Sequence, residues 1–166
     1  MATLDRVTEF YSDLKSYGIL PLTAGGDHLI SLPILRGLSS GNAVSMIHFD
    51  SHTNLFNEYF GGTRYTHGTP FRRAIEEGVL DPKRTIQIGI RGTMYDDEDR
   101  RFAADAGVTL ILIEELRERG VADVMEQARD LVGDSATYVS YDIDFIDPAF
   151  APGTGTPEIG GPDTFT

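Results

Sequence analysis

Side chains that could bind a metal are concentrated in three short segments of this sequence. The sequence contains four His, and all of them lie between residues 28 and 67. His28 ends the segment AGGDH, Asp50 and His52 lie in HFDSH, and Asp142 and Asp144 lie in SYDID. Because the sequence has no Cys, these imidazole and carboxylate groups suit Mn²⁺ and are compatible with Fe, Co, Ni or Zn. The three segments therefore predict a site for a divalent metal.

Each segment directly follows a short apolar run that is typical of a buried strand. The carboxyl ends of parallel strands meet at one edge of a sheet, where open α/β sheets bind their ligands. Residues 50 and 52, and likewise 142 and 144, project to the same side if the backbone stays extended. Groups that are far apart in the sequence can therefore converge on one site.

Carboxylates gathered in one place need a cation. Without one, three aspartates would repel each other, and each buried carboxylate would cost several kcal/mol or become neutral through a raised pKa. Two divalent ions roughly 3.5–4 Å apart, bridged by shared carboxylates, would remove this conflict and lower the pKa of a bridging water, which yields hydroxide near neutral pH. That chemistry belongs to a hydrolase.

The polar residues of these segments also have a simpler interpretation, in which the Asp side chains cap turns and the His side chains pack in the core. Asp147 precedes a proline and is assigned to turn formation. Asp27 is expected to brace the glycine turn before His28. His48 lies inside an apolar strand and is expected in the core or beside the metal ligands.

The spacing of apolar residues predicts alternating helices and strands, which implies crossover connections and a mainly parallel sheet. The fold class is therefore α/β, with helices on both faces of the sheet, in a single domain of residues 1–166. Helices are expected over residues 4–14, 29–38, 69–78, 96–106 and 114–132, the last divided at Gly120, and strands over residues 19–24, 43–49, 85–90, 108–113 and 136–141.

The charge and the N-terminus exclude several classes of protein. A formal net charge of −12 disfavours nucleic acid and anionic membranes, which attract basic surfaces, and favours a cationic metal or substrate. The N-terminus MATLDRVTEF carries charge where a signal peptide would be apolar, and no run approaches the roughly 18 apolar residues of a membrane span. A cytoplasmic location is expected.

Five motifs, in this order, resemble the ureohydrolases, the family of arginases and agmatinases. The resemblance is closest to agmatinases and guanidino-acid hydrolases, and it spans most of the chain. The motifs are GGDH at 25–28, HFDSH at 48–52, YTHGTPFR at 65–72, SYDIDFIDP at 140–148 and APGTGTPEIGG at 151–161.

The resemblance implies an arginase-like three-layer α/β/α fold with two Mn²⁺ ions. His28 would bind one ion and His52 the other, Asp50 and Asp142 would bridge them, and Asp144 would bind the second ion and orient the hydroxide. The loop histidine His67 would act as a proton shuttle or general acid at the leaving amine. Trimers or hexamers are common in this family.

The chain departs from the family at one ligand and in its length. Asn54 stands where the family has an aspartate of the first metal's shell, and its amide brings no charge. Losing one partner of a buried charged cluster costs about 3–5 kcal/mol, so we expect the first metal site to be weakened. Family members are nearly twice as long and supply a later glutamate for the guanidinium, a role not assigned to Glu158. The chain is therefore expected to be a fragment.

The predicted function is a metal-dependent hydrolase that releases urea from a guanidino compound such as agmatine or a guanidino acid. In this prediction Asp144 and His67 are the catalytic residues. The alternative is a non-catalytic or weakly active metal-binding relic of the same family. A metal amidohydrolase similar to the histone deacetylases is a third reading, and the GTGTPE loop argues against it.

Overall fold

The computed structural model describes residues 2–39, 41–93 and 97–165. The chain divides into two compact units, each described by itself. The helical unit comprises Met1–Val44 and Asn54–Asp81, and the sheet unit comprises Ser45–Thr53 and Pro82–Thr166. The expectation of a single domain over 1–166 stays a prediction.

The helical unit is built on α1 (Ala2–Ser16), the 3-10 helix η1 (His28–Ile30), α2 (Ser31–Ser39) and α3 (Pro70–Glu76). Helices α1 and α2 pack closely, and a Cβ at Gly37 would lie only 2.7 Å from the carbonyl oxygen of Thr8. The Arg36 guanidinium on α2 binds Glu77, which follows α3, at 2.7 Å. These contacts hold α1 against α2 and tie α2 to the residue that follows α3.

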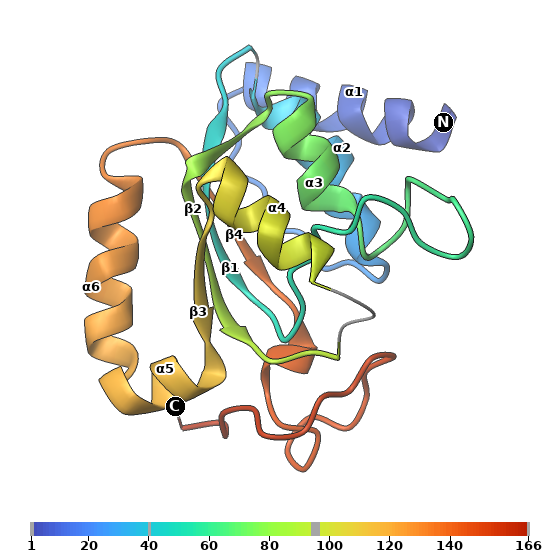
Figure 1. The fold of residues 1–166 in the computed structure, drawn as a ribbon. Helices are drawn as coiled ribbons and strands as arrows, with labels where there is room; N and C mark the ends of the chain where they lie inside the picture. The colour runs from blue at the N-terminus through green and yellow to red at the C-terminus, as the bar shows by residue number, and fades with distance from the viewer. Residues whose placement is uncertain (1, 40, 94–96, 166) are drawn as a thin grey trace. The chain divides into compact units, whose positions relative to one another are not determined.

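The sheet unit contains four strands in the order β3-β2-β1-β4 (Figure 1). Strand β1 pairs in parallel with β4, and β2 pairs in parallel with β3. The chain moves outward from β1 to β2 and β3 and then returns to the other side of β1, so β1 and β4 flank a topological switch point. The strands are β1 (Val44–Phe49), β2 (Leu80–Ile90), β3 (Thr109–Leu112) and β4 (Thr137–Tyr141).

Helices lie on both faces of this sheet. Helices α5 (Ile113–Arg119) and α6 (Val121–Val132) lie on one side and α4 (Glu98–Ala106) on the other (Figure 1). Apolar side chains from β1, β2 and β3 meet those of α5 and α6 in the main core. A parallel sheet covered on both faces confirms the predicted α/β class.

Most predicted elements are confirmed to within two residues at each end, and β2 begins five residues earlier than expected. Gly120 separates α5 from α6, as expected, with φ of 81°. Thr69 occupies the N-cap position of α3, but its hydroxyl accepts from the Thr66 amide rather than from the helix. The expected start of α4 at residue 96 lies outside the described residues.

The predicted buried strand at residues 19–24 is wrong. These residues form neither helix nor strand, and Leu20 and Leu22 have relative exposures of 95% and 101%. A strand needs a neighbour to satisfy its backbone hydrogen bonds, and Pro21 also removes one donor. Within the described chain no strand pairs with this segment, so its apolar residues stay exposed.

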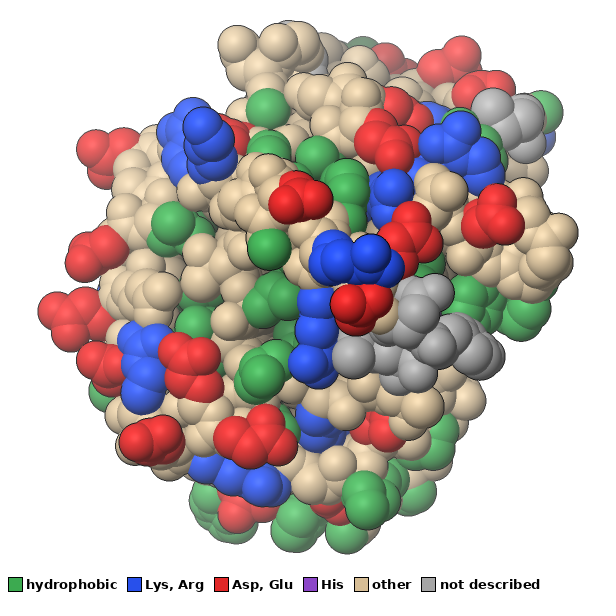
Figure 2. Space-filling view, in the orientation of Figure 1, with side chains coloured by type: hydrophobic (Ala, Val, Ile, Leu, Met, Phe, Trp, Pro, Cys, Tyr) green, Lys and Arg blue, Asp and Glu red, His purple; other side chains and the backbone are tan. Residues whose placement is uncertain are grey.

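Acidic side chains are spread over the surface. Asp and Glu total 26 against 14 Lys and Arg, and Figure 2 shows both signs interspersed across the visible face. Surface charge therefore marks no binding face in this view. The buried charged groups are more informative.

Candidate metal centre

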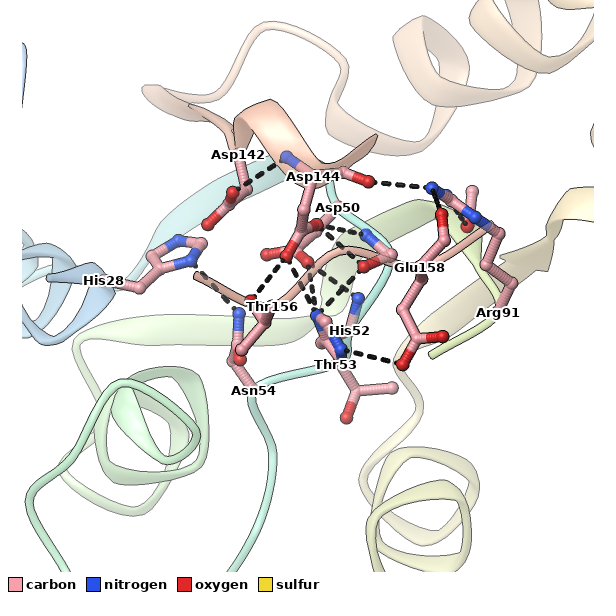
Figure 3. Close-up of polar contacts among 12 residues, drawn as sticks. His28, Asp50, His52, Thr53, Asn54, Arg91, Asp142, Asp144, Thr156 and Glu158 are labelled. Carbon is pink, nitrogen blue, oxygen red and sulfur yellow. Dashed lines mark hydrogen bonds and ion pairs between the residues drawn. The ribbon is translucent and has the colours of Figure 1, made fainter. Parts of the chain in front are cut away.

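Three potential ligands converge in the sheet unit, at the carboxyl ends of β1 and β4. Asp50 and His52 follow β1, and Asp144 lies in the 3-10 helix η2 (Ile143–Phe145) that follows β4. One ligand atom from each of the three residues lies within 4.8 Å of the others (Figure 3). The Asp50–His52–Asp144 cluster thus occupies the switch point, where this class of sheet binds ligands.

Asp50 is held by hydrogen bonds at both oxygens and is 1% exposed. Its Oδ1 accepts from the His52 amide at 2.7 Å, and its Oδ2 is 2.9 Å from His48 Nε2. Gln87 Nε2 donates to Thr53 O at 2.7 Å and lies 3.1 Å from His48 Nδ1. Because an amide NH₂ only donates, His48 Nδ1 accepts and its Nε2–H donates to Asp50. His48 is therefore a hydrogen-bond donor to the Asp50 carboxylate and helps to hold it in place.

Asp144 is held in the same way and is 1% exposed. Its Oδ1 accepts from the Ser51 amide at 3.0 Å and from the Ser51 hydroxyl at 2.7 Å. Its Oδ2 accepts from the Thr156 hydroxyl at 3.0 Å and lies 3.1 Å from His52 Nδ1. The carboxylate is therefore oriented by groups from two segments, the one after β1 and the loop that contains Thr156.

His52 is surrounded by carboxylates. Its Nδ1 lies 3.1 Å from Asp144 and 3.5 Å from Asp50, and its Nε2 lies 3.6 Å from Glu158 (Figure 3). Burial lowers the pKa of His52, but the hydrogen bonds and charges of Asp144 and Asp50 outweigh it and raise the pKa to about 10. The raised pKa favours the imidazolium form of His52, whose charge would balance these carboxylates. Two carboxylates and an imidazole are a donor set that fits a divalent ion such as Mn²⁺.

Residues after β2 complete the surroundings of the cluster. A Cβ at Gly92 would lie 2.4 Å from the His52 ring and 2.9 Å from Ser51 O, so only glycine fits there. Arg91 donates to the Asp144 carbonyl at 2.7 Å and to the Glu158 carbonyl at 2.8 Å. Burial lowers the pKa of Arg91 despite the nearby acids. Arg91 thereby links the loop that contains Glu158 to η2, the segment that follows β4.

Four residues around the cluster were not predicted from the sequence: Gln87, Arg91, Gly92 and Thr156. Arg91 and Gly92 follow β2 directly, so the rule that ligands gather at the carboxyl ends of strands could have found them. Gln87 lies inside the apolar strand itself, and only its burial opposite His48 indicates its role.

Asp142 belongs to the sheet unit but lies outside the Asp50–His52–Asp144 cluster. It is the N-cap of η2, and its Oδ1 accepts from the Asp144 amide at 3.0 Å (Figure 3). The backbone therefore turns here rather than continuing extended, so residues 142 and 144 do not present their carboxylates as a strand would. The role of Asp142 as a bridging ligand stays a prediction.

His28 and Asn54 contact each other in the helical unit. Asn54 is 5% exposed, and its Nδ2 lies 3.1 Å from His28 Nδ1. The His28 ring also meets the Phe71 ring edge to face, with centroids 5.3 Å apart. His28 begins η1 and follows no strand, so the expectation that it ends a strand-loop motif is corrected. Asp27 caps η1 by accepting from the Leu29 amide at 2.8 Å.

His67 lies in the loop before α3, also in the helical unit. Its ring packs against Tyr59 and Phe60, with centroid distances of 5.4 and 5.7 Å. The aromatic contacts hold the ring in a half-buried position. The proton-transfer role of His67 stays a prediction.

The chain belongs to the arginase family, whose profile matches residues 1–166. It is 55% identical to a guanidinopropionase of Pseudomonas aeruginosa over 159 residues, which cover 96% of this chain and 50% of that protein. It is 43% identical to a mitochondrial agmatinase of Gallus gallus over 157 residues, 94% of this chain and 46% of that protein. The expected resemblance to ureohydrolases is confirmed.

Solved structures agree with this assignment. The proclavaminate amidino hydrolase of Streptomyces clavuligerus matches with a TM-score of 0.84 and 37% identity, over 95% of this chain and 52% of that chain. The arginase-like α/β fold is thereby confirmed. The chain spans about half the length of the relatives it matches. Among the described helices, none has the length and apolar character of a membrane span.

Proposed function

We propose that this chain supplies the metal-binding part of a manganese-dependent hydrolase that releases urea from a guanidino compound. The Asp50–His52–Asp144 cluster at the switch point carries this proposal, because its ligand atoms lie within 4.8 Å of one another. The names of the relatives support the substrate class, since both the guanidinopropionase and the agmatinase act on guanidino compounds. A guanidino acid or agmatine is the proposed substrate.

Asp50, His52 and Asp144 would hold the ion. A bound divalent ion lowers the pKa of a coordinated water and stabilises negative charge that develops during hydrolysis. Since the His52 proton must leave before Nδ1 can coordinate, ion uptake is coupled to proton release. His28 and Asp142 remain ligands predicted only from the resemblance.

The protein residues would orient the reactants and move protons. Ser51 donates to one oxygen of Asp144 and Thr156 donates to the other. Because its carboxylate is fixed in this way, Asp144 can orient a nucleophile. His67 would donate a proton to the departing amine. The buried acids and the net charge of −12 favour a cationic guanidinium over an anionic substrate.

One observation favours the relic as a second candidate. Asn54 provides an amide beside His28 and thus no charge for an ion at that position. A chain of this kind could bind metal through the cluster without turnover. Urea production therefore separates the two functions, whereas metal binding does not.

The test is urea release by the Mn²⁺-loaded chain from 3-guanidinopropionate, 4-guanidinobutyrate and agmatine. We expect release from at least one of them, and its loss in Asp144→Asn. Asp163→Asn, which removes the same charge in the exposed C-terminal segment, is the matched control. Full metal loading without urea from any of the three compounds would reject the enzyme and leave the relic.

We further propose a cytoplasmic location and assembly into trimers or hexamers, both from the resemblance alone. Cell fractionation and light scattering of the purified chain test them. A chain found in the membrane or extracellular fraction, or a monomer at all concentrations, would contradict these two proposals.

A further inference from the structure

The two nitrogens of the His52 ring face different carboxylates. Nδ1 lies 3.1 Å from Asp144 and 3.5 Å from Asp50, within the cluster. Nε2 lies on the other side of the ring, 3.6 Å from Oε1 of Glu158 (Figure 3). A neutral imidazole carries one proton, so a ring that binds an ion through Nδ1 has its N–H at Nε2. That N–H would point at Glu158.

Glu158 is held in place by residues that follow β2. Its Oε1, the oxygen nearest to His52, accepts from the Thr93 amide at 2.9 Å. The Arg91 guanidinium donates to the carbonyl of Glu158 at 2.8 Å and to the carbonyl of Ile159 at 3.2 Å. Both the carboxylate and the backbone of Glu158 are therefore fixed by groups other than His52.

The same segment packs against the His52 ring. A Cβ at Gly92 would lie 2.4 Å from Cδ2 of His52 and 2.8 Å from its Nε2. The Gly92 amide also donates to the Ser51 carbonyl at 2.7 Å, which ties the segment to the residue before His52. Residues 91–93 thus contact the Nε2 edge of the ring and also hold the carboxylate of Glu158 that faces this edge.

We infer that Glu158 is a positioning residue of the metal centre, which accepts from Nε2–H of His52 and keeps Nδ1 directed at the ion. An acceptor behind an imidazole ligand fixes both the tautomer and the orientation of the ring. Hydrogen bonds of this kind span about 2.7–3.2 Å, so the two groups need to approach by roughly half an ångström. The inference rests on the proposed metal centre and adds to it a residue that acts through His52.

Two substitutions separate the reach of this side chain from its charge. Glu158→Gln keeps an oxygen acceptor at the same reach and removes the charge, whereas Glu158→Asp keeps the charge and shortens the side chain by one methylene. Loss of such an outer partner weakens metal binding about 10–100-fold. In calorimetric Mn²⁺ titrations of the purified chain we expect this loss in Glu158→Asp and a smaller one in Glu158→Gln. Glu118→Gln, which removes the same charge at an exposed position of α5, should leave the affinity unchanged.

Nuclear magnetic resonance gives a second readout, on the His52 ring itself. The chain is labelled with ¹⁵N-histidine and loaded with Zn²⁺, a diamagnetic substitute for Mn²⁺, so that the proton on each ring nitrogen can be observed. The wild-type chain and Glu158→Gln should show a slowly exchanging proton on Nε2 of His52. In Glu158→Asp this proton should exchange faster with water, because its acceptor is out of reach. A general loss of stability would not single out this proton.

The order of the variants decides the result. Mn²⁺ binding that is weakened as much in Glu158→Gln as in Glu158→Asp, or more, would overturn the inference, because the charge of Glu158 would then matter rather than its position. Unchanged affinity in Glu158→Asp would overturn it too, while leaving the metal centre in place. A wild-type chain that binds no Mn²⁺ rejects the centre itself. The expected order without urea release rejects the proposed hydrolase and keeps this inference.

Discussion

The Asp50–His52–Asp144 cluster and the His28–Asn54 pair each place an imidazole next to a short polar side chain. They differ in one atom of that side chain, the oxygen of a carboxylate against the nitrogen of an amide. In the cluster, carboxylates raise the pKa of His52 to about 10 and hold a positive charge. In the pair, the Asn54 amide lies 3.1 Å from His28 Nδ1 and brings no charge of its own. The carboxylates of the cluster therefore supply negative charge for a cation to balance, and the amide of Asn54 supplies none.

The largest effect should come from removing a charge from the cluster. Asp144→Asn keeps the shape of the side chain but leaves the imidazole and the ion with one carboxylate fewer. Losing one partner of a buried charged group costs about 3–5 kcal/mol, so Mn²⁺ affinity should fall roughly 100-fold or more. Calorimetric titration measures it. An unchanged affinity would remove the distinction between the cluster and the pair.

The next largest effect on Mn²⁺ affinity should come from displacing the His52 ring by a substitution that changes no charged group. In Gly92→Ala the new methyl group would lie 2.4 Å from the His52 ring, so the ring or the strand end must move. Overpacking of this kind costs about 1–3 kcal/mol, and Mn²⁺ affinity should fall together with the thermal midpoint. Gly155→Ala, where a Cβ meets nothing within 4 Å, is the control. Equal behaviour of the two variants would show that His52 needs no fixed position.

A similar or smaller effect should come from the residues behind Asp50. Gln87→Leu removes the donor to His48 Nδ1 and to Thr53 O. Leaving buried acceptors unpaired costs about 1–3 kcal/mol, so the free energy of unfolding should fall by that amount, with a smaller loss of Mn²⁺ affinity. Urea denaturation of the metal-free and loaded chains separates the two effects. A loss confined to ion binding would instead assign Gln87 directly to the site.

The smallest effect is expected from a change of one pH unit. The folded pKa of His52, about 10, lies above the ordinary value of 6.5, so its contribution to stability is complete below pH 6.5 and is lost as the pH rises to 10. The metal-free chain should therefore lose at most about 1.4 kcal/mol per pH unit between these values. Denaturation at pH 7 and pH 8 measures this loss. His52→Asn should remove the slope, and an unchanged slope would assign the titration to another group.

Local patterns predicted most of the helices and strands because each is specified by its own apolar spacing and by residues such as Gly120 at its ends. The strand at 19–24 failed because a strand depends on a partner, which its own residues do not contain. Its apolar residues satisfied the pattern, and yet Leu20 and Leu22 are exposed.

The site was predictable where its residues follow strands. Asp50, His52 and Asp144 come directly after β1 and β4, and their convergence follows from the parallel sheet. The turn at Asp142 was not predictable from alternation, since it depends on a hydrogen bond to the Asp144 amide. Asn54 could be singled out in the sequence, but its hydrogen bond to His28 required coordinates.

The most direct test of the central claim is a crystal of the chain grown with Mn²⁺ and measured at the manganese absorption edge. The anomalous map shows the ions themselves, independently of activity. The account predicts one strong peak in contact with Asp50, His52 Nδ1 and Asp144. A strong peak at His28 with none at these three residues, or no peak at all in a fully folded chain, would contradict it.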